Sequence, residues 1–191
     1  MKLHHFTSAR HLRGIGLYGL TVGDVPTNLA SNAGRCGVWL TSDSNPEGHG
    51  LGGRCDKKQF RLTVDAPDDE LLVRWVEWSA KYATPDTVRN LHSTAPGFNS
   101  WYVYFGSIPR SAIIDCVDMQ TGSRVENWAD RPPSSSDIEP VPPWRRAAWH
   151  KKLLRKVAKE LVRIGQRPPD ARPRAASGEG CILVMRPNHH L

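Results

Sequence analysis

The chain contains no long hydrophobic run. A membrane-spanning helix needs about 20 consecutive apolar residues, and the longest apolar stretches among the 191 residues of this chain are far shorter. Met1 and Lys2 lead directly into His4 and His5, without the apolar segment of a secretory signal. The sequence therefore predicts a soluble, cytoplasmic protein that has no membrane partner.

Cysteine is scarce, and no two cysteines form a Cys-x-x-Cys pair. The four cysteines are widely spaced, which favours free buried thiols over a disulfide framework. Cys36, His49 and Cys55 are residue types that bind zinc, but their spacing fits no common zinc module. We therefore expect no metal site.

Acidic residues are scarce in one part of the chain. The net charge is +7, and residues 144–174 contain eleven Lys or Arg against only Glu160 and Asp170. That segment carries a net +9, so the remainder of the chain carries a net −2. The basic character therefore belongs to one element.

A change in composition divides the chain. Residues 127–143 contain five prolines and three serines without apolar periodicity, which is typical of a linker. The length favours one domain with an appendage over two domains. We expect a domain over residues 1–130, a linker over residues 131–143, and a basic element over residues 144–191 that packs on the same domain.

The basic element is predicted to be an amphipathic helix that begins near Trp144, followed by a final strand at residues 181–185. Its apolar stripe suits packing on the domain, while its basic stripe suits nucleic acid, an acidic membrane or a partner groove. Plain packing with solvated charges accounts for the pattern equally well. The residues expected to contact nucleic acid are Lys152, Arg155, Lys156, Lys159 and Arg163.

The first 41 residues organise the rest of the chain. A short apolar run ends in His5 and Thr7, and Ser8 is a suitable N-cap for a helix over residues 8–20 that Gly19 ends. Residues 21–35 are rich in turn-forming residues and are expected to form a loop, followed by a strand at residues 37–41. This order places polar groups at the end of a strand.

Further elements follow from alternation and helical spacing. The glycine-rich residues 42–54 suit a flap over a site, or equally an ordinary surface loop. The remaining expected elements are strands at residues 58–64, 101–108 and 113–117, a helix at residues 67–82, and a loop at residues 83–99.

The motif His5-Phe6-Thr7-Ser8, a helix ending at Gly19-Leu20 and a strand at residues 37–41 together resemble the opening of the ADP-ribosyltransferase superfamily. The nearest branches are the RNA 2'-phosphotransferases and the nucleic-acid-modifying toxins. The resemblance implies an α+β fold with split antiparallel sheets around a cleft. It also implies NAD as the cofactor and a macromolecular acceptor, either nucleic acid or protein.

The resemblance further implies roles for individual residues. His5, Thr7 and Asp115 are the expected catalytic residues. The expected NAD-binding residues are His5, Phe6, Thr7, Thr41, Arg61 and Tyr104. Among them, Arg61 suits bidentate binding of phosphate.

One feature departs from the family pattern. The strand at residues 101–108 lacks the carboxylate that would stabilise an oxocarbenium-like transition state. Three alternatives follow. The acid comes from elsewhere in the chain, with Asp115 and Asp118 as the nearest candidates, or the protein acts without an acid by binding phosphate through basic groups. The third alternative is a retained fold without catalysis. The sequence therefore predicts an NAD-dependent transferase, and leaves open a non-catalytic module that binds nucleic acid or protein.

Overall fold

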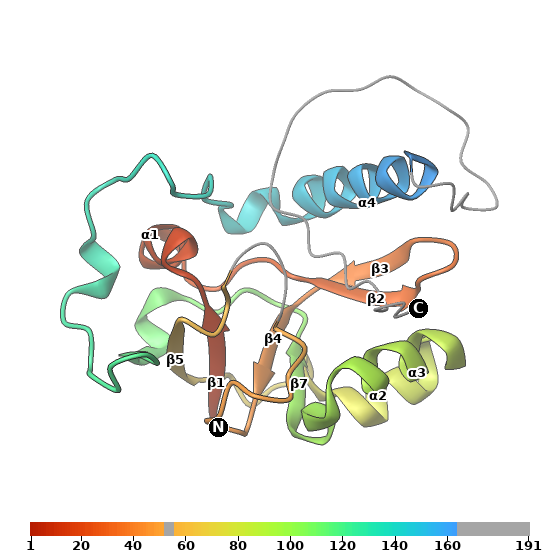
Figure 1. Ribbon diagram of the computed structural model, residues 1–191, viewed down its shortest axis with the longest axis horizontal. Coiled ribbons are helices and arrows are strands. Elements are labelled where there is room, and N and C mark those ends of the chain that lie inside the picture. The colour runs from red at the N-terminus through yellow and green to blue at the C-terminus, as the bar shows by residue number, and fades with distance from the viewer. Residues whose placement is uncertain (52–55, 164–191) are drawn as a thin grey trace, which may run out of the picture.

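A six-stranded antiparallel sheet forms the centre of the computed structural model, which describes residues 1–51 and 56–163 (Figure 1). The strand expected at residues 181–185 lies outside these residues. The strands follow the order β6-β7-β4-β1-β5-β8. Their bounds are Leu72–Arg74 for β6, Trp101–Tyr104 for β7, Val38–Thr41 for β4, Lys2–Thr7 for β1, Phe60–Asp65 for β5 and Ile113–Asp118 for β8.

Backbone pairing in the sheet confirms the strands predicted around β1, β4, β5, β7 and β8, although β7 ends at Tyr104, before the predicted residue 108. In β5, Phe60, Leu62 and Val64 are buried, whereas the residues between them are partly exposed. Successive side chains of a strand point to opposite faces of the sheet. The pairing of β1 with β5, with His5 opposite Leu62, therefore places His5 on the same face as that apolar set.

Helix α1 (Ala9–Tyr18) covers this first face. It starts after Ser8 and ends at Gly19, as predicted, and buries Leu12 and Ile15 against the core. Gly19 has a φ of +76°, a backbone conformation that favours glycine. A Cβ atom at this position would meet the carbonyl oxygen of Ile108 at 2.0 Å. Both the conformation and the close approach require glycine here.

Tryptophan side chains fill the second face beside β4 and β7. Trp75, Trp78 and Trp101 are buried, and the ring of Trp39 lies 4.9 Å from that of Trp75. Helices α2 (Trp75–Tyr82) and α3 (Pro85–Thr94) cover this cluster (Figure 1).

The helix predicted over residues 67–82 is wrong in its first half. Residues Leu72–Arg74 form the edge strand β6, and only Trp75–Tyr82 is helical. Asp69 turns the chain before the strand, since its carboxylate accepts from the amide of Leu71 at 3.0 Å. Pairing with β7 satisfies backbone groups that helical spacing alone had assigned to a helix.

Two predicted loops also contain regular structure. In and directly after the predicted loop 21–35, β2 (Asp24–Asn28) and β3 (Ala33–Cys36) form a separate two-stranded antiparallel sheet. Within residues 83–99, α3 begins after Thr84, whose hydroxyl accepts from the amide of Thr87, with Pro85 in the first turn. An N-cap threonine followed by proline is a helix start signal that the sequence already contained.

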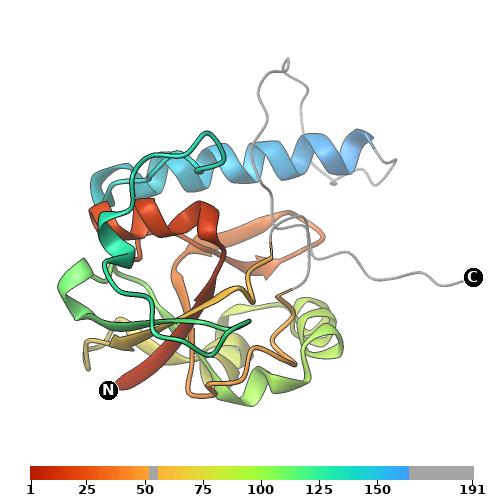
Figure 2. The same ribbon diagram turned by 60° about the vertical axis from the view of Figure 1, so that its left-hand side comes forward.

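The segment expected to be a linker packs against α1. The amide of Ile138 donates to the carbonyl of Arg10 at 2.9 Å, and the hydroxyl of Thr21 donates to the carbonyl of Val141 at 2.7 Å. The segment runs around the outside of α1 before it enters α4 (Arg146–Arg163) (Figure 2). Residues 131–143 therefore attach the basic helix closely to the domain.

The fold is thus mixed α+β, as predicted, although one six-stranded sheet and one two-stranded sheet replace the two small sheets expected. Among residues 1–51 and 56–163, no helix has the length and apolar character required to cross a membrane.

Candidate functional site

His5, in the middle of β1, donates a hydrogen bond through one ring nitrogen and keeps the other as an acceptor. Its Nδ1 lies 2.9 Å from the carbonyl oxygen of Trp39. Because a carbonyl can only accept, Nδ1 carries the proton, and Nε2 is left with a free lone pair. Burial lowers the pKa of His5 to about 4, which the bond to Trp39 opposes and the charge of Lys57 assists. The imidazole is therefore neutral near pH 7.

His11, one helical turn into α1, has a similar environment. Its Nδ1 lies 3.0 Å from the hydroxyl of Ser8, so Ser8 contacts this ring instead of capping the helix with its side chain. Burial lowers the pKa of His11 to about 4, with further lowering from the charges of Lys57 and His5. The strand end and the first turn of α1 thus bring two neutral imidazoles close to one ammonium.

Lys57 is a partly buried cation for which the described part of the chain provides no acidic partner. Burial lowers the pKa of its ammonium to about 8. Within residues 1–51 and 56–163, no hydrogen bond or ion pair is made by this ammonium. A desolvated charge costs stability unless an opposite charge or acceptor meets it. His5, Ser8, His11 and Lys57 are called the His5 cluster below.

The sequence-predicted residues divide between the two faces of the sheet. Thr7 shares the face of His5 and is buried. Tyr104 also lies on that face, where its hydroxyl donates to Asp69 at 3.1 Å. Burial and this carboxylate raise the pKa of Tyr104. Phe6 has its side chain on the opposite face, because successive side chains alternate.

Thr41 and Arg61 also lie on the opposite face, since Thr41 pairs with His4 and Arg61 pairs with Phe6. The hydroxyl of Thr41 accepts from the amide of Asp43 at 3.0 Å. Arg61 donates to the carbonyl of Ser44 at 3.1 Å. Both side chains therefore hold the loop after β4, and the structure does not bring them to His5.

A second polar cluster, on the face of the sheet that carries Phe6, holds the same loop. His49 is buried, its Nδ1 accepts from the indole N–H of Trp101 at 2.8 Å, and its Nε2 lies 3.6 Å from the carboxylate of Asp43. The ring stacks on that of Phe6, with centroids 5.9 Å apart. The segment 42–54 was predicted to suit a flap or an ordinary surface loop, and its residues 52–54 lie outside the described residues. Residues 42–50 are tied to the sheet by buried contacts.

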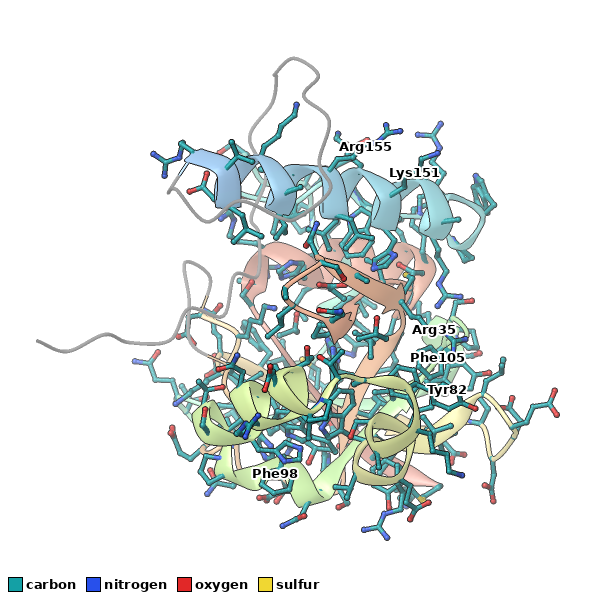
Figure 3. All side chains as sticks on the ribbon, turned by 90° about the vertical axis from the view of Figure 1, so that its right-hand side faces the viewer. Arg35, Tyr82, Phe98, Phe105, Lys151 and Arg155 are labelled. Atoms are coloured by element: carbon teal, nitrogen blue, oxygen red, sulfur yellow. The ribbon has the colours of Figure 1, made fainter. Side chains whose placement is uncertain are left out.

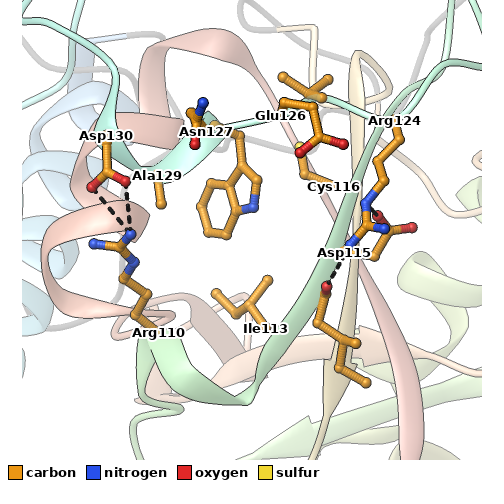
Figure 4. A pocket seen from close by; sticks show the side chains of 12 residues that line it. Arg110, Ile113, Asp115, Cys116, Arg124, Glu126, Asn127, Ala129 and Asp130 are labelled. Carbon is orange, nitrogen blue, oxygen red and sulfur yellow. Dashed lines mark hydrogen bonds and ion pairs between the residues drawn. The ribbon is translucent and has the colours of Figure 1, made fainter.

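Asp115 lies away from the other two expected catalytic residues. It is on the edge strand β8, where it pairs with Thr63 and faces the side of the sheet opposite His5. Its carboxylate forms an ion pair with Arg124 at 2.9 Å (Figure 4). It lines a separate hollow of about 230 Å³ together with Arg110 and Asp130, which form an ion pair of their own.

Asp118, the other acid considered, shares the face of His5 but lies two strands from β1, about 10 Å across the sheet. Its carboxylate accepts from the amides of Gln120 and Thr121, at 2.8 and 3.2 Å, and so caps a turn. The structure therefore places neither candidate acid beside His5.

Helix α4 presents part of its predicted basic stripe to solvent. Lys152, Arg155 and Lys159 are exposed, whereas Lys156 is half-buried. Arg163 is exposed but pairs with Glu160 at 2.6 Å. Figure 3 shows Arg155 and the neighbouring Lys151 on the side of α4 that faces away from the sheet.

Three of the four residues in the His5 cluster were not expected at the site. Lys57 and His11 carry only weak local signals, since an isolated lysine or histidine is ordinarily solvated. Lys57 lies two residues before Gln59, and His11 lies about one turn after Ser8. The side-chain oxygen of Gln59 accepts from the amide of Ala9 at 2.8 Å. That contact holds the start of β5 against the start of α1.

Comparison with protein families, characterised proteins and solved structures finds no match. In the part of the chain that the structure describes, no three His, Cys, Asp or Glu side chains gather as a metal site.

Proposed function

We propose that the chain is an NAD-dependent transferase of the ADP-ribosyltransferase type, which acts at the His5 cluster on a macromolecular, nucleic-acid acceptor. The related reaction, removal of a phosphate from RNA by NAD, belongs to the same proposal. One observation supports it: the neutral imidazole of His5 lies within electrostatic range of the desolvated ammonium of Lys57, which has no acidic partner among the described residues.

This pair of groups suits a dinucleotide. The free Nε2 of His5 can accept a hydrogen bond from a ribose hydroxyl. The ammonium of Lys57 can neutralise part of a diphosphate, and such charge-assisted contacts are the stronger kind of hydrogen bond. Bound NAD would supply a glycosidic bond at the ribose C1' carbon, which the acceptor attacks while nicotinamide departs with the bonding electrons.

The cluster contains one basic group, Lys57, and two neutral imidazoles, whereas Asp115 and Asp118 are engaged elsewhere. Chemistry that depends on binding phosphate needs basic groups. This composition supports the phosphate-removing reaction over ordinary ADP-ribosylation, which uses a carboxylate to stabilise the transition state. The same lack of an acid is the observation that favours a non-catalytic binding module as the second candidate.

The test is incubation of the purified full chain with NAD labelled in its adenylate part, together with RNA, RNA bearing a 2'-phosphate, DNA or protein. Transfer of label, or release of phosphate linked to NAD consumption, is the expected result. His5→Ala should reduce the rate at least tenfold. His4→Ala is the matched control, because it removes the neighbouring imidazole from the other face of the same strand.

Binding of NAD is measured separately by calorimetry. Lys57→Met should weaken it about tenfold, while Lys58→Met, which removes a partly exposed lysine paired with Glu47, should leave it unchanged. Absence of NAD binding by the unaltered chain would exclude the transferase. Binding that is retained in both His5→Ala and Lys57→Met would place the NAD site elsewhere.

A further inference from the structure

A largely exposed tryptophan lies just before the start of the basic helix. Trp144 is 76% exposed, although large aromatic side chains are mostly buried in folded proteins. Its ring meets that of Tyr18 edge to face at 5.9 Å, and Leu17 beside them is also exposed. These side chains border a hollow of about 450 Å³, called the Trp144 hollow, that Arg13, Pro140 and Arg145 complete.

The backbone around Trp144 is fixed by its neighbours. Pro142, two residues before Trp144, is buried. Arg146, two residues after Trp144, donates to the carbonyl of Thr21 at 2.6 Å and to that of Phe105 at 3.0 Å. The exposed ring therefore projects from an anchored segment. Because its position is set before any ligand arrives, binding loses little conformational freedom.

The rim of the hollow is predominantly positive. Arg13 and Arg145 have no acidic partner within residues 1–51 and 56–163, and Glu139 is the one acidic residue that lines the hollow. Helix α4 begins directly after Arg145 and continues the positive charge through Lys152 and Arg155. An aromatic face bordered by cations matches a nucleotide, whose base stacks and whose phosphate is negative.

We propose that this surface binds single-stranded nucleic acid, with one unstacked base in the Trp144 hollow and its backbone on Arg145 and the basic face of α4. A single strand is favoured over a duplex, because the bases of a duplex are stacked on one another and offer no free face to Trp144. The inference rests on the proposed function in naming its acceptor class, but the binding is independent of NAD.

The test is fluorescence anisotropy of the full chain, without NAD, against labelled single-stranded RNA, single-stranded DNA and a duplex of the same sequence. The single strands should bind more tightly than the duplex. Trp144→Ala should weaken single-strand binding by about 5- to 160-fold, the range for loss of one stacked base. Tyr82→Ala is the control, because it removes a 60% exposed aromatic ring from α2.

Arg145→Glu should weaken binding of the single strands and reduce its dependence on salt concentration, whereas Lys81→Glu on α2 makes the same change of charge with little effect. Equal affinity for duplex and single strand, or no effect of Trp144→Ala, would overturn the proposal. Binding through Trp144 to vesicles of anionic lipid without binding to the oligonucleotides would also overturn it.

His5→Ala separates this inference from the proposed function. That variant should bind the oligonucleotides like the unaltered chain and lose only NAD-dependent transfer. Transfer without a contribution from Trp144 would refute the acceptor surface alone, while oligonucleotide binding without any transfer would refute the chemistry alone.

Discussion

Neutral histidines are the main feature of the proposed site at the scale of single residues. His5 and His11 each have a pKa near 4 in the folded protein, against an ordinary value of 6.5. The unfolded chain therefore takes up protons first as the pH falls. Stability from these two groups is complete above about pH 6.5 and is lost as the pH falls from there toward 4.

The first prediction is that the free energy of unfolding declines between pH 6.5 and pH 5, measured by urea denaturation. A fully realised shift of this size corresponds to at most about 3 kcal/mol per histidine, and partial solvation of the rings reduces it. His11→Gln should flatten the decline, since the glutamine does not titrate. A variant whose stability falls as steeply as that of the unaltered chain would contradict the pKa of His11.

The second prediction concerns Gly19, where α1 ends. Gly19→Ala should destabilise the fold by more than about 2 kcal/mol, because it combines a positive φ with a clash against the Ile108 carbonyl. Gly122→Ala is the matched control, because Gly122 also has a positive φ, +71°, but has open space around it. Its cost should be about 1 kcal/mol. Equal melting temperatures of the two variants would contradict the clash.

At the scale of elements, α4 depends on a few polar anchors. Arg146 donates to backbone carbonyls of three separate segments, and His150 lies 2.9 Å from the carboxylate of Asp24 on β2. Asn32 in the turn after β2 donates to the carbonyl of Leu154 at 2.6 Å. These contacts attach the basic helix to the two-stranded sheet, and the segment over α1 leads into it.

The third prediction follows from these anchors. Arg146→Ala should lower the free energy of unfolding by about 2–3 kcal/mol, because it leaves partly buried carbonyls without donors. It should also speed the tryptic cleavage of α4, by loosening the docked helix. Arg145→Ala, one residue earlier, should change neither quantity. Similar cleavage rates for the two variants would show that Arg146 does not hold the helix.

At the scale of the whole molecule, charge is separated between two parts of the chain. The segment 144–174 carries +9 and the remainder −2, so nucleic acid should approach from the side of α4. The fourth prediction is that the Lys152→Glu, Arg155→Glu double variant lowers the slope of log affinity against log salt by about 2. An anisotropy titration between 50 and 200 mM salt, on the order of physiological values, measures this slope. An unchanged slope would remove α4 from the interface.

Much of the local structure could be predicted from the sequence. Alternation identified β5, aromatic and β-branched composition identified β7, glycine marked the end of α1, and the two stripes identified α4. These features succeed because they depend on neighbours within one element. The helix prediction failed at Leu72–Arg74, because these residues pair with β7, which is distant in the chain.

The site itself was only partly predictable. His5 and Thr7 were correctly expected on one strand, but the residues that surround His5 depend on the order of strands and the face each side chain takes. The sequence alone determined the strands, the amphipathic helix and the uneven charge, because these are properties of residues near one another in the chain. Only the tertiary structure decided that Lys57 and His11, and neither Asp115 nor Arg61, lie with His5, because strand order and the alternation of the pleat assign side chains to opposite faces.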